Sequence, residues 1–158
     1  MKQLEHSEFI KELAILKRSI TLQRSSITEE GLATLAKHPL VSIQSHTVTH
    51  PVLINCSQKT LDWELTESKK FLENKVGKDI IAFSYPNGDF GEREIKAVEN
   101  AGYKIAFTTK AQKIDTTSLD NIYIVPRKAI NTNGGKYENL AKVLGVWQKT
   151  LSIFNKIR

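Results

Sequence analysis

Residues 41–51 read VSIQSHTVTHP, and this stretch carries the strongest information about the fold. Its first part, 41–47, is short, rich in β-branched residues and polar at its end, which is typical of a strand that leads into a loop. His46 and His50 follow four residues apart, and Pro51 closes the loop. In parallel α/β folds, functional side chains gather at the carboxyl ends of the strands. The stretch therefore predicts that both imidazoles lie on the functional rim of an α/β fold.

The spacing of the two histidines suggests a metal site. If the chain turns helically after the strand, the rings of His46 and His50 point to the same side and can share one cation. Neutral imidazole is the commonest protein ligand for zinc and related metals. The competing interpretation is a hydrogen-bonded pair of histidines that caps a strand, and the spacing alone leaves both open.

On both sides of this stretch, helices alternate with strands. Hydrophobic periodicity, capping residues and prolines predict the elements from sequence. The expected helices are 4–20, a short one from Thr28 to Pro39, 57–76, 92–100 and one from 137 onward, and the further expected strands are 79–85, 103–109 and 121–130. Strands that alternate with helices favour a parallel sheet with crossover helices. The fold class is therefore α/β, with about four parallel strands and covering helices.

A second polar segment follows the strand 79–85. Residues 83–89 read FSYPNGD, so a Pro-Asn-Gly turn stands at the end of a buried strand and could line the same rim as the histidines. Backbone N–H groups in such a turn can stabilise a developing oxyanion. The alternative is a plain strand-to-helix turn, for which this composition is also common.

Composition limits the class of protein. The chain has 158 residues, which suggests one domain. The N-terminus lacks the pattern of a signal peptide and no apolar run is long enough to cross a bilayer, so we expect a cytoplasmic protein without a membrane partner. The single cysteine, Cys56, rules out an internal disulfide and a cysteine-based zinc cluster. The net charge of +6 lies on scattered lysines rather than on a basic stripe with aromatics, so we expect no nucleic-acid partner.

Taken together, the motifs resemble those of the polysaccharide deacetylase family of metal-dependent carbohydrate esterases. The resemblance covers residues 28–130 and is carried by motif order, spacing and the linking helix. The matching stretches are SHTVTHP (45–51), ESKKFLENKVGK (67–78), IIAFSYPNGDF (80–90) and AGYKIAFTT (101–109). The expected domain organisation is a helical segment at 1–27 followed by a partial deacetylase-like domain at 28–158.

The resemblance implies a distorted β/α barrel, an acetylated carbohydrate as substrate, and hydrolytic removal of its acetyl groups. The family usually holds zinc with two histidines and one aspartate, and His46 and His50 match those histidines. Thr47 matches a hydroxyl residue that supports the loop. The turn that shapes the substrate groove matches Tyr85, Pro86, Asn87 and Gly88, with the Asn87 N–H as the oxyanion donor. Arg127 could reach the groove and bind a sugar or a carboxylate, or form a surface ion pair instead.

The chain also departs from the family pattern. The family's first motif, of the Thr-Phe-Asp-Asp-Gly type, supplies the catalytic base and the third metal ligand, but residues 1–45 contain no aspartate. The family's last motif supplies a histidine as general acid, but no histidine follows His50, and Ser84 stands where many members have an arginine. Asp89 is the best spare acid, although aspartate is also common in turns. We therefore expect a truncated or divergent homologue with a partial barrel, weakly bound zinc and no identified base or acid.

Two further expectations remain open at this point. The alternative function is a non-catalytic carbohydrate-binding or scaffold protein derived from a deacetylase. Strand 41–47 would also present an unpaired edge where the family's front strands would lie, and such edges attract partners. The expected partners are a carbohydrate, together with a second copy of the chain or a separate N-terminal fragment.

Overall fold

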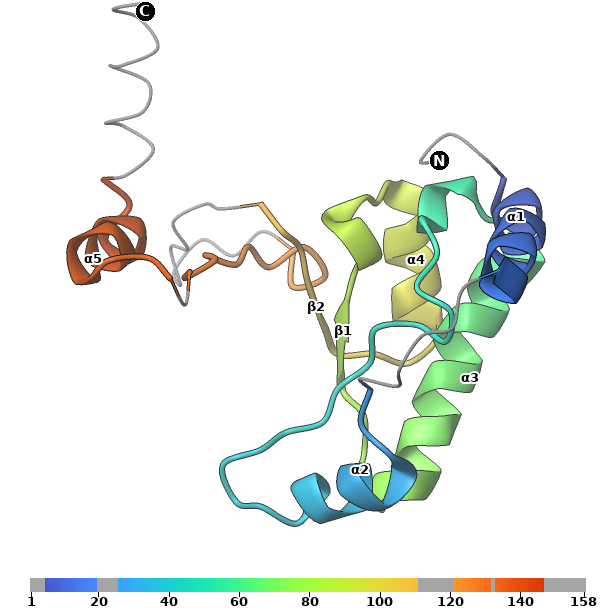
Figure 1. The fold of residues 1–158 in the computed structure, drawn as a ribbon, viewed down its shortest axis with the longest axis horizontal. Helices are drawn as coiled ribbons and strands as arrows, with labels where there is room; N and C mark the ends of the chain where they lie inside the picture. Colours follow the sequence, from blue (N-terminus) through green and yellow to red (C-terminus); the bar gives the residue numbers. More distant parts are fainter. Residues whose placement is uncertain (1–4, 20–25, 111–120, 132, 147–158) are drawn as a thin grey trace, which may run out of the picture.

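A parallel pair of strands lies at the centre of the computed structural model (Figure 1), which describes residues 5–19, 26–110, 121–131 and 133–146. The strands are β1 (Ala82–Ser84) and β2 (Ile105–Phe107), paired in the register Ala82 with Ile105 and Ser84 with Phe107. The predicted α/β class with parallel strands is therefore confirmed at this pair.

The two outer predicted strands are reduced to single parallel bridges. Ser45 pairs with Phe83 on one side, and Val125 pairs with Phe107 on the other. The expectation of four full strands in a partial barrel is therefore not confirmed in the described part of the chain. The local cause is visible in the backbone: Thr47 turns to a φ of 68° directly after the first bridge, and Pro126, which follows the second, has no N–H to donate.

The predicted helices are present, with clear local reasons for their ends. The longest helix, α3 (Gln58–Val76), begins where the Ser57 side chain accepts a hydrogen bond from the Thr60 N–H, and it ends at Gly77, whose φ is 65°. The shorter α2 (Glu29–Ala36) is capped in the same way by Thr28. The others are α1 (His6–Ser19), α4 (Glu92–Asn100) and α5 (Lys136–Leu144), with two short 3₁₀ helices, η1 (Leu53–Asn55) and η2 (Pro86–Gly88).

The end of α5 differs from the sequence prediction. The amphipathic stripe continues through Trp147, Leu151 and Phe154, but Gly145 adopts a φ of 75° and ends α5 at Leu144. The remaining stripe residues lie outside the described residues. None of the residues of α5 is buried. The helix is linked to the preceding segment by the Lys128 ammonium, which donates to the Val143 carbonyl at 2.6 Å, and by the Asn139 side chain, which hydrogen-bonds the backbone of Asn131.

The hydrophobic core lies between the strands and two helices. Figure 1 shows α3 and α4 side by side on one face of β1 and β2. The side chains that fill this layer are Leu53, Cys56, Leu61, Leu65, Ile80, Phe83, Tyr85, Ala97, Val98, Tyr103 and Ala106. The core thus joins β1, α4 and β2 to α3. It also fixes the end of β1, where the turn at residues 85–89 begins.

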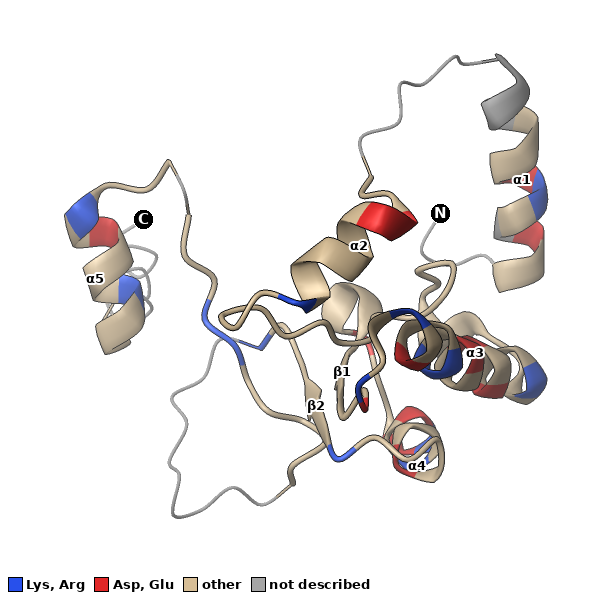
Figure 2. Cartoon of the chain, turned by 90° about the horizontal axis from the view of Figure 1, so that it is seen from below, with Lys and Arg blue, Asp and Glu red and all other residues tan. Residues whose placement is uncertain are grey.

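Charged residues of both signs alternate on the outer helices. Figure 2 shows basic and acidic residues interleaved along α3 and α5, and Lys69–Glu73, Lys70–Glu67 and Lys142–Glu138 are ion pairs. The excess of basic residues therefore does not form a separate stripe on these helices. In the described ranges, no helix is long and apolar enough to cross a membrane.

Candidate metal centre and substrate turn

The loop of residues 45–51 starts from a fixed, buried point. The Ser45 N–H donates to the Ala82 carbonyl at 3.1 Å, and the Ser45 carbonyl accepts from the Ser84 N–H at 3.0 Å. The Ser45 hydroxyl lies 2.9 Å from the Ser68 hydroxyl and 2.8 Å from that of Tyr103. This buried cluster joins the loop to α3 and to the segment before β2, so the position from which His46 projects is well defined.

His46 and His50 lie next to each other at the surface. Their ring centroids are 4.8 Å apart with an interplanar angle of 74°. Nδ1 of His46 lies 2.7 Å from the Ser84 carbonyl oxygen. Because a carbonyl only accepts, Nδ1 carries the proton and donates, and the lone pair of the neutral ring is on Nε2. This is how a metal-ligating histidine is usually held, with one nitrogen fixed by a backbone carbonyl and the other available to the metal.

The electrostatic surroundings favour the neutral form of His46. Partial burial lowers its pKa below the ordinary value, the bond to the Ser84 carbonyl raises it, and the nearby charges of His50 and Arg127 lower it. The net direction is downward, so the ring is neutral around pH 7 and able to act as a ligand. His46 therefore fits a metal ion in both tautomer and protonation, and the His50 ring lies beside it with a centroid distance of 4.8 Å.

A third protein ligand is not found beside the pair. Within the part of the chain that the structure describes, no group of three or more histidine, cysteine, aspartate or glutamate side chains could hold a metal ion. Asp89 stands at the end of the η2 turn and is half-buried there. The described residues thus offer two imidazoles as ligands.

Thr47 bridges the two histidines through its hydroxyl. Its Oγ1 donates to the His46 carbonyl at 2.5 Å and accepts from the His50 N–H at 3.1 Å. Thr47 and His50 both adopt positive φ values, 68° and 58°. Such values are uncommon for residues other than glycine, most of all for a β-branched residue. The loop is therefore held in a tight conformation that its local sequence does not favour.

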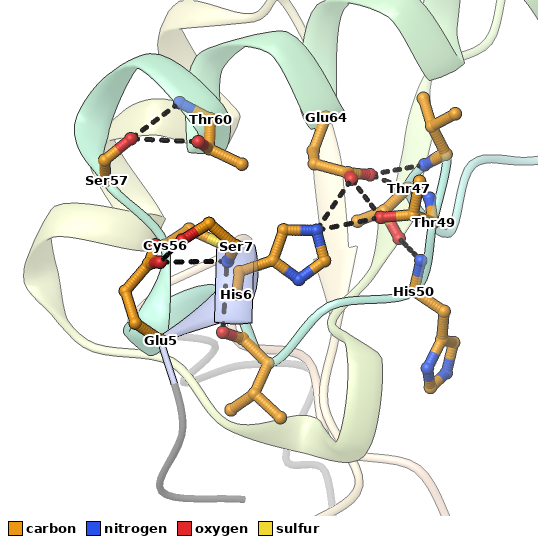
Figure 3. Close-up of polar contacts among 12 residues, drawn as sticks. Glu5, His6, Ser7, Thr47, Thr49, His50, Cys56, Ser57, Thr60 and Glu64 are labelled. Carbon is orange, nitrogen blue, oxygen red and sulfur yellow. Dashed lines mark hydrogen bonds and ion pairs between the residues drawn. The ribbon is translucent and has the colours of Figure 1, made fainter. Parts of the chain in front are cut away.

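Glu64 is the residue of this site that sequence reasoning missed. Its side chain comes from α3 and is fully buried under the loop, as Figure 3 shows. Oε2 accepts from the N–H groups of Val48 at 2.7 Å and Thr49 at 3.0 Å, and Oε1 accepts from the Thr49 hydroxyl. The sequence places Glu64 next to Leu65 on the apolar face of the helix. A charged side chain buried there needs a hydrogen-bonding partner, and this could have marked Glu64 as a candidate.

His6 of α1 reaches the same carboxylate. Its Nε2 lies 3.8 Å from Glu64 Oε1 and 3.2 Å from the Thr49 hydroxyl, and the ring is buried. Figure 3 shows His6 between α1 and the loop, with the His50 ring pointing away from Glu64. The N-terminal helix thus contacts the histidine loop through His6, which lies 43 residues before Thr49 in sequence.

The turn after β1 divides into buried and exposed residues. Tyr85 and Pro86 are fully buried; the Tyr85 ring stacks on Phe90 at 4.9 Å, and burial raises the pKa of its hydroxyl. The structure therefore places these two predicted groove residues beneath the turn, where they support it. Asn87 is exposed with a φ of 57°, and Gly88 follows with a φ of 77°. Asn87 is thus the member of the turn that a ligand would meet.

Arg127 is held near the histidines by β2. Its Nε donates to the Thr108 carbonyl at 3.0 Å, and its backbone N–H donates to the Lys110 carbonyl at 3.2 Å. Its charge contributes to the lowered pKa of His46. Tryptophan side chains can stack on sugars; Trp63 is half-exposed on α3, and Trp147 lies outside the described residues.

A hollow of about 410 Å³ lies on the α3 side of the histidine loop. Its lining is mainly apolar and consists of Thr47, Val48, Glu67, Ser68, Phe71 and Leu72. Glu67, the carboxylate of this lining, is paired with Lys70 at 3.0 Å. A carbohydrate needs more polar partners than this lining offers, so the histidines and Asn87 are better placed to meet a sugar.

Replacing Gly88 with alanine should disturb the turn at residues 85–89. A Cβ at this position would lie 1.9 Å from Thr109 Oγ1, and the φ of 77° is itself unfavourable for alanine. We expect a loss of about 1–2 kcal/mol from the left-handed backbone and a further loss of about 1–3 kcal/mol from the clash. Urea denaturation of both proteins measures the sum.

Gly77→Ala is the matched control for this change. Gly77 has a similar φ of 65°, but no atom lies within 4 Å of the Cβ that alanine would add. The control should show the backbone cost alone. Equal losses for the two variants would mean that Thr109 does not confine the turn.

The model of the polysaccharide deacetylase family matches residues 11–106. This span is more than half of the chain's 158 residues, and it includes both histidines, Glu64 and the substrate turn. The chain therefore belongs to the polysaccharide deacetylase family, as the motifs predicted.

Individual relatives agree with this assignment. The chain is 34% identical over 84 residues to YxkH of Bacillus subtilis (strain 168), whose name assigns it provisionally to the polysaccharide deacetylases; the match covers 53% of this chain and 30% of YxkH. Among solved structures, the Streptococcus pyogenes deacetylase PplD, in complex with acetate, is 25% identical with a TM-score of 0.65 and covers 74% of this chain and 50% of its own. BC0361, a polysaccharide deacetylase from Bacillus cereus, has a similar fold, with 24% identity and a TM-score of 0.67. The match covers 75% of this chain and 37% of BC0361. The chain spans half or less of the length of these relatives.

Proposed function

We propose that this chain forms the histidine half of a metal-dependent deacetylase site, which acts on the acetyl groups of an N- or O-acetylated carbohydrate. The observation that carries the proposal is the pair His46 and His50, with Nδ1 of His46 fixed by the Ser84 carbonyl and its Nε2 lone pair left for a metal. A pair held in this way is expected at a metal centre and has no evident purpose in a simple strand cap.

The chemistry follows from the residues around the pair. A divalent metal such as zinc would, when bound, supply Lewis-acid polarisation of the acetyl carbonyl and make water more acidic. His46 and His50 would hold that metal. The N–H of Asn87, at the exposed tip of the turn, would donate to the oxygen on which negative charge develops. Arg127, held by the Thr108 carbonyl, would orient the sugar.

We also propose that the catalytic site is incomplete in this chain. The described residues contain no carboxylate beside the histidine pair to act as a third ligand, and no histidine follows His50 in the sequence. The missing groups would come from sequence outside these 158 residues, from a separate N-terminal fragment or from a second copy of the chain. The alternative, a non-catalytic carbohydrate-binding protein, is less favoured because a sugar-binding surface does not require two neighbouring imidazoles, one of them held in a fixed tautomer.

Metal titration tests the proposal directly. We expect weak binding of Zn²⁺ or Co²⁺ at one site, because catalytic zinc sites typically use three protein ligands and this one offers two. Loss of an outer-shell partner typically weakens metal binding by about 10- to 100-fold. His46→Ala and His50→Ala each remove a direct ligand and should weaken binding by more than this. Isothermal titration calorimetry on the three proteins gives the affinities.

His38→Ala is the matched control, because His38 is an exposed histidine whose Nδ1 accepts from the Leu40 N–H at the end of α2. This variant should bind metal like the wild type. Tight metal binding that neither His46→Ala nor His50→Ala reduces would show that the site lies elsewhere.

A further inference from the structure

We propose that Glu64 is the positioning residue of the metal centre: its buried carboxylate holds the loop between His46 and His50 in the conformation that brings the two rings together. This inference rests on the proposed metal site and extends it to a residue that touches neither histidine side chain. The argument begins with the backbone of the loop.

The loop conformation needs external support. Thr47 and His50 both have positive φ values, 68° and 58°. Such a conformation is unfavourable for residues other than glycine and persists only where surrounding contacts enforce it. Thr47 contributes one internal bridge, from the His46 carbonyl to the His50 N–H. Without a second support, the chain between the histidines would be free to relax and separate the rings.

Glu64 supplies that support at the centre of the loop. Its carboxylate accepts three hydrogen bonds, from the Val48 N–H, the Thr49 N–H and the Thr49 hydroxyl. Both donor residues lie between the two histidines in sequence, so the bonds act on the part of the backbone that sets the distance between the rings. Hydrogen bonds to a charged acceptor are also roughly twice as strong as neutral ones.

The carboxylate is itself firmly placed. Glu64 is fully buried on α3, and the adjacent turns of the helix place Leu61, Leu65 and Ser68 in the same buried layer. His6 of α1 lies on the other side of the Thr49 hydroxyl, 3.2 Å away (Figure 3). A buried carboxylate is costly unless its oxygens are satisfied, and here the donors that satisfy it are those of the histidine loop. This explains why the helix has a charged residue on its apolar face.

The test separates positioning from general stability. Glu64→Leu removes both oxygens at similar volume, and we expect its affinity for Co²⁺ or Zn²⁺ to fall by about 10- to 100-fold, as for other outer-shell partners. Glu64→Gln keeps one oxygen for the two N–H groups, so its affinity should lie between those of Glu64→Leu and the wild type. Calorimetry is performed at a temperature at which circular dichroism shows each variant to be folded.

Two controls accompany these variants. Glu67→Leu makes the same chemical change one turn later on α3, at a partly exposed side chain paired with Lys70. Leu65→Ala creates a cavity in the core next to Glu64 and lowers stability without removing a bond to the loop. Both should bind metal like the wild type. If Glu64→Leu and Glu64→Gln also bind like the wild type, the positioning role is refuted.

Two more measurements keep the result decisive. If Glu64→Leu does not fold, Thr49→Val removes one of the three bonds at constant shape, and wild-type affinity in both Thr49→Val and Glu64→Gln then refutes the proposal.

If the wild type binds no metal, the proposed function fails, while hydrogen exchange still tests whether Glu64 supports the loop. The amides of Val48 and Thr49 should exchange slowly in the wild type and faster in Glu64→Gln; equal rates would overturn the inference.

Discussion

Replacement of Phe83 by alanine should lower the free energy of unfolding by about 3–5 kcal/mol. Phe83 is 1% exposed at the centre of β1, and its ring centroid lies 5.3 Å from that of Tyr85 and 5.2 Å from that of Tyr103. Removing a buried phenylalanine side chain costs about 3–5 kcal/mol, a large fraction of the about 5–15 kcal/mol by which native domains are stable. Because Phe83 also forms the bridge to Ser45, the change should loosen the strand that carries the histidines.

The unfolding free energy of Phe83→Ala is measured by urea denaturation followed by circular dichroism. Phe71→Ala is the control: the same residue type on α3, 46% exposed at the surface, for which we expect a loss below about 1 kcal/mol. A Phe83→Ala variant as stable as the control would mean that the layer between the strands and α3 is not the main core.

The helices were predictable from sequence because their signals are local. The expected helix 57–76 is present as α3, and its ends are set by adjacent residues, the N-cap Ser57 and Gly77. The two histidines could be singled out for the same reason, since four residues of spacing at the end of a strand is a local pattern. Where a signal spans few residues, sequence reasoning located the element or the candidate group.

Contacts between distant segments could not be predicted in this way. Glu64 meets Thr49 across 15 residues and His6 meets Thr49 across 43, and no periodic pattern marks such pairs. The same limit applies to the outer strands: the apolar composition of 41–47 and 121–130 predicted pairing, but the backbone turns away after one bridge on each side. The length of a strand depends on its neighbours, which the residues of the strand do not specify.

The largest expected effect concerns catalysis. The chain alone, supplied with Zn²⁺ or Co²⁺, should release no acetate from acetylated chito-oligosaccharides or xylan beyond the metal-only blank. A general base and a general acid each contribute typically about 10²–10⁴-fold. The residues that would supply them by resemblance to the family are absent from this sequence, since residues 1–45 contain no aspartate and no histidine follows His50. Two imidazoles and a turn can hold a metal and orient a carbonyl, but they do not supply the proton transfers that hydrolysis of an amide or ester requires.

The assay needs a positive control and a matched variant. Full-length PplD, named as a deacetylase, should release acetate in the same assay if it accepts the substrate offered, which shows that the conditions support turnover. If the wild-type chain is inactive as expected, His50→Ala should release no less acetate than the wild type. Metal-dependent release by the wild type that His50→Ala abolishes would contradict the expectation and would require a base within reach of the metal. Asp89 is then the first residue to replace, since its half-buried carboxylate stands at the end of the same turn as Asn87, and loss of the activity in Asp89→Asn would identify it.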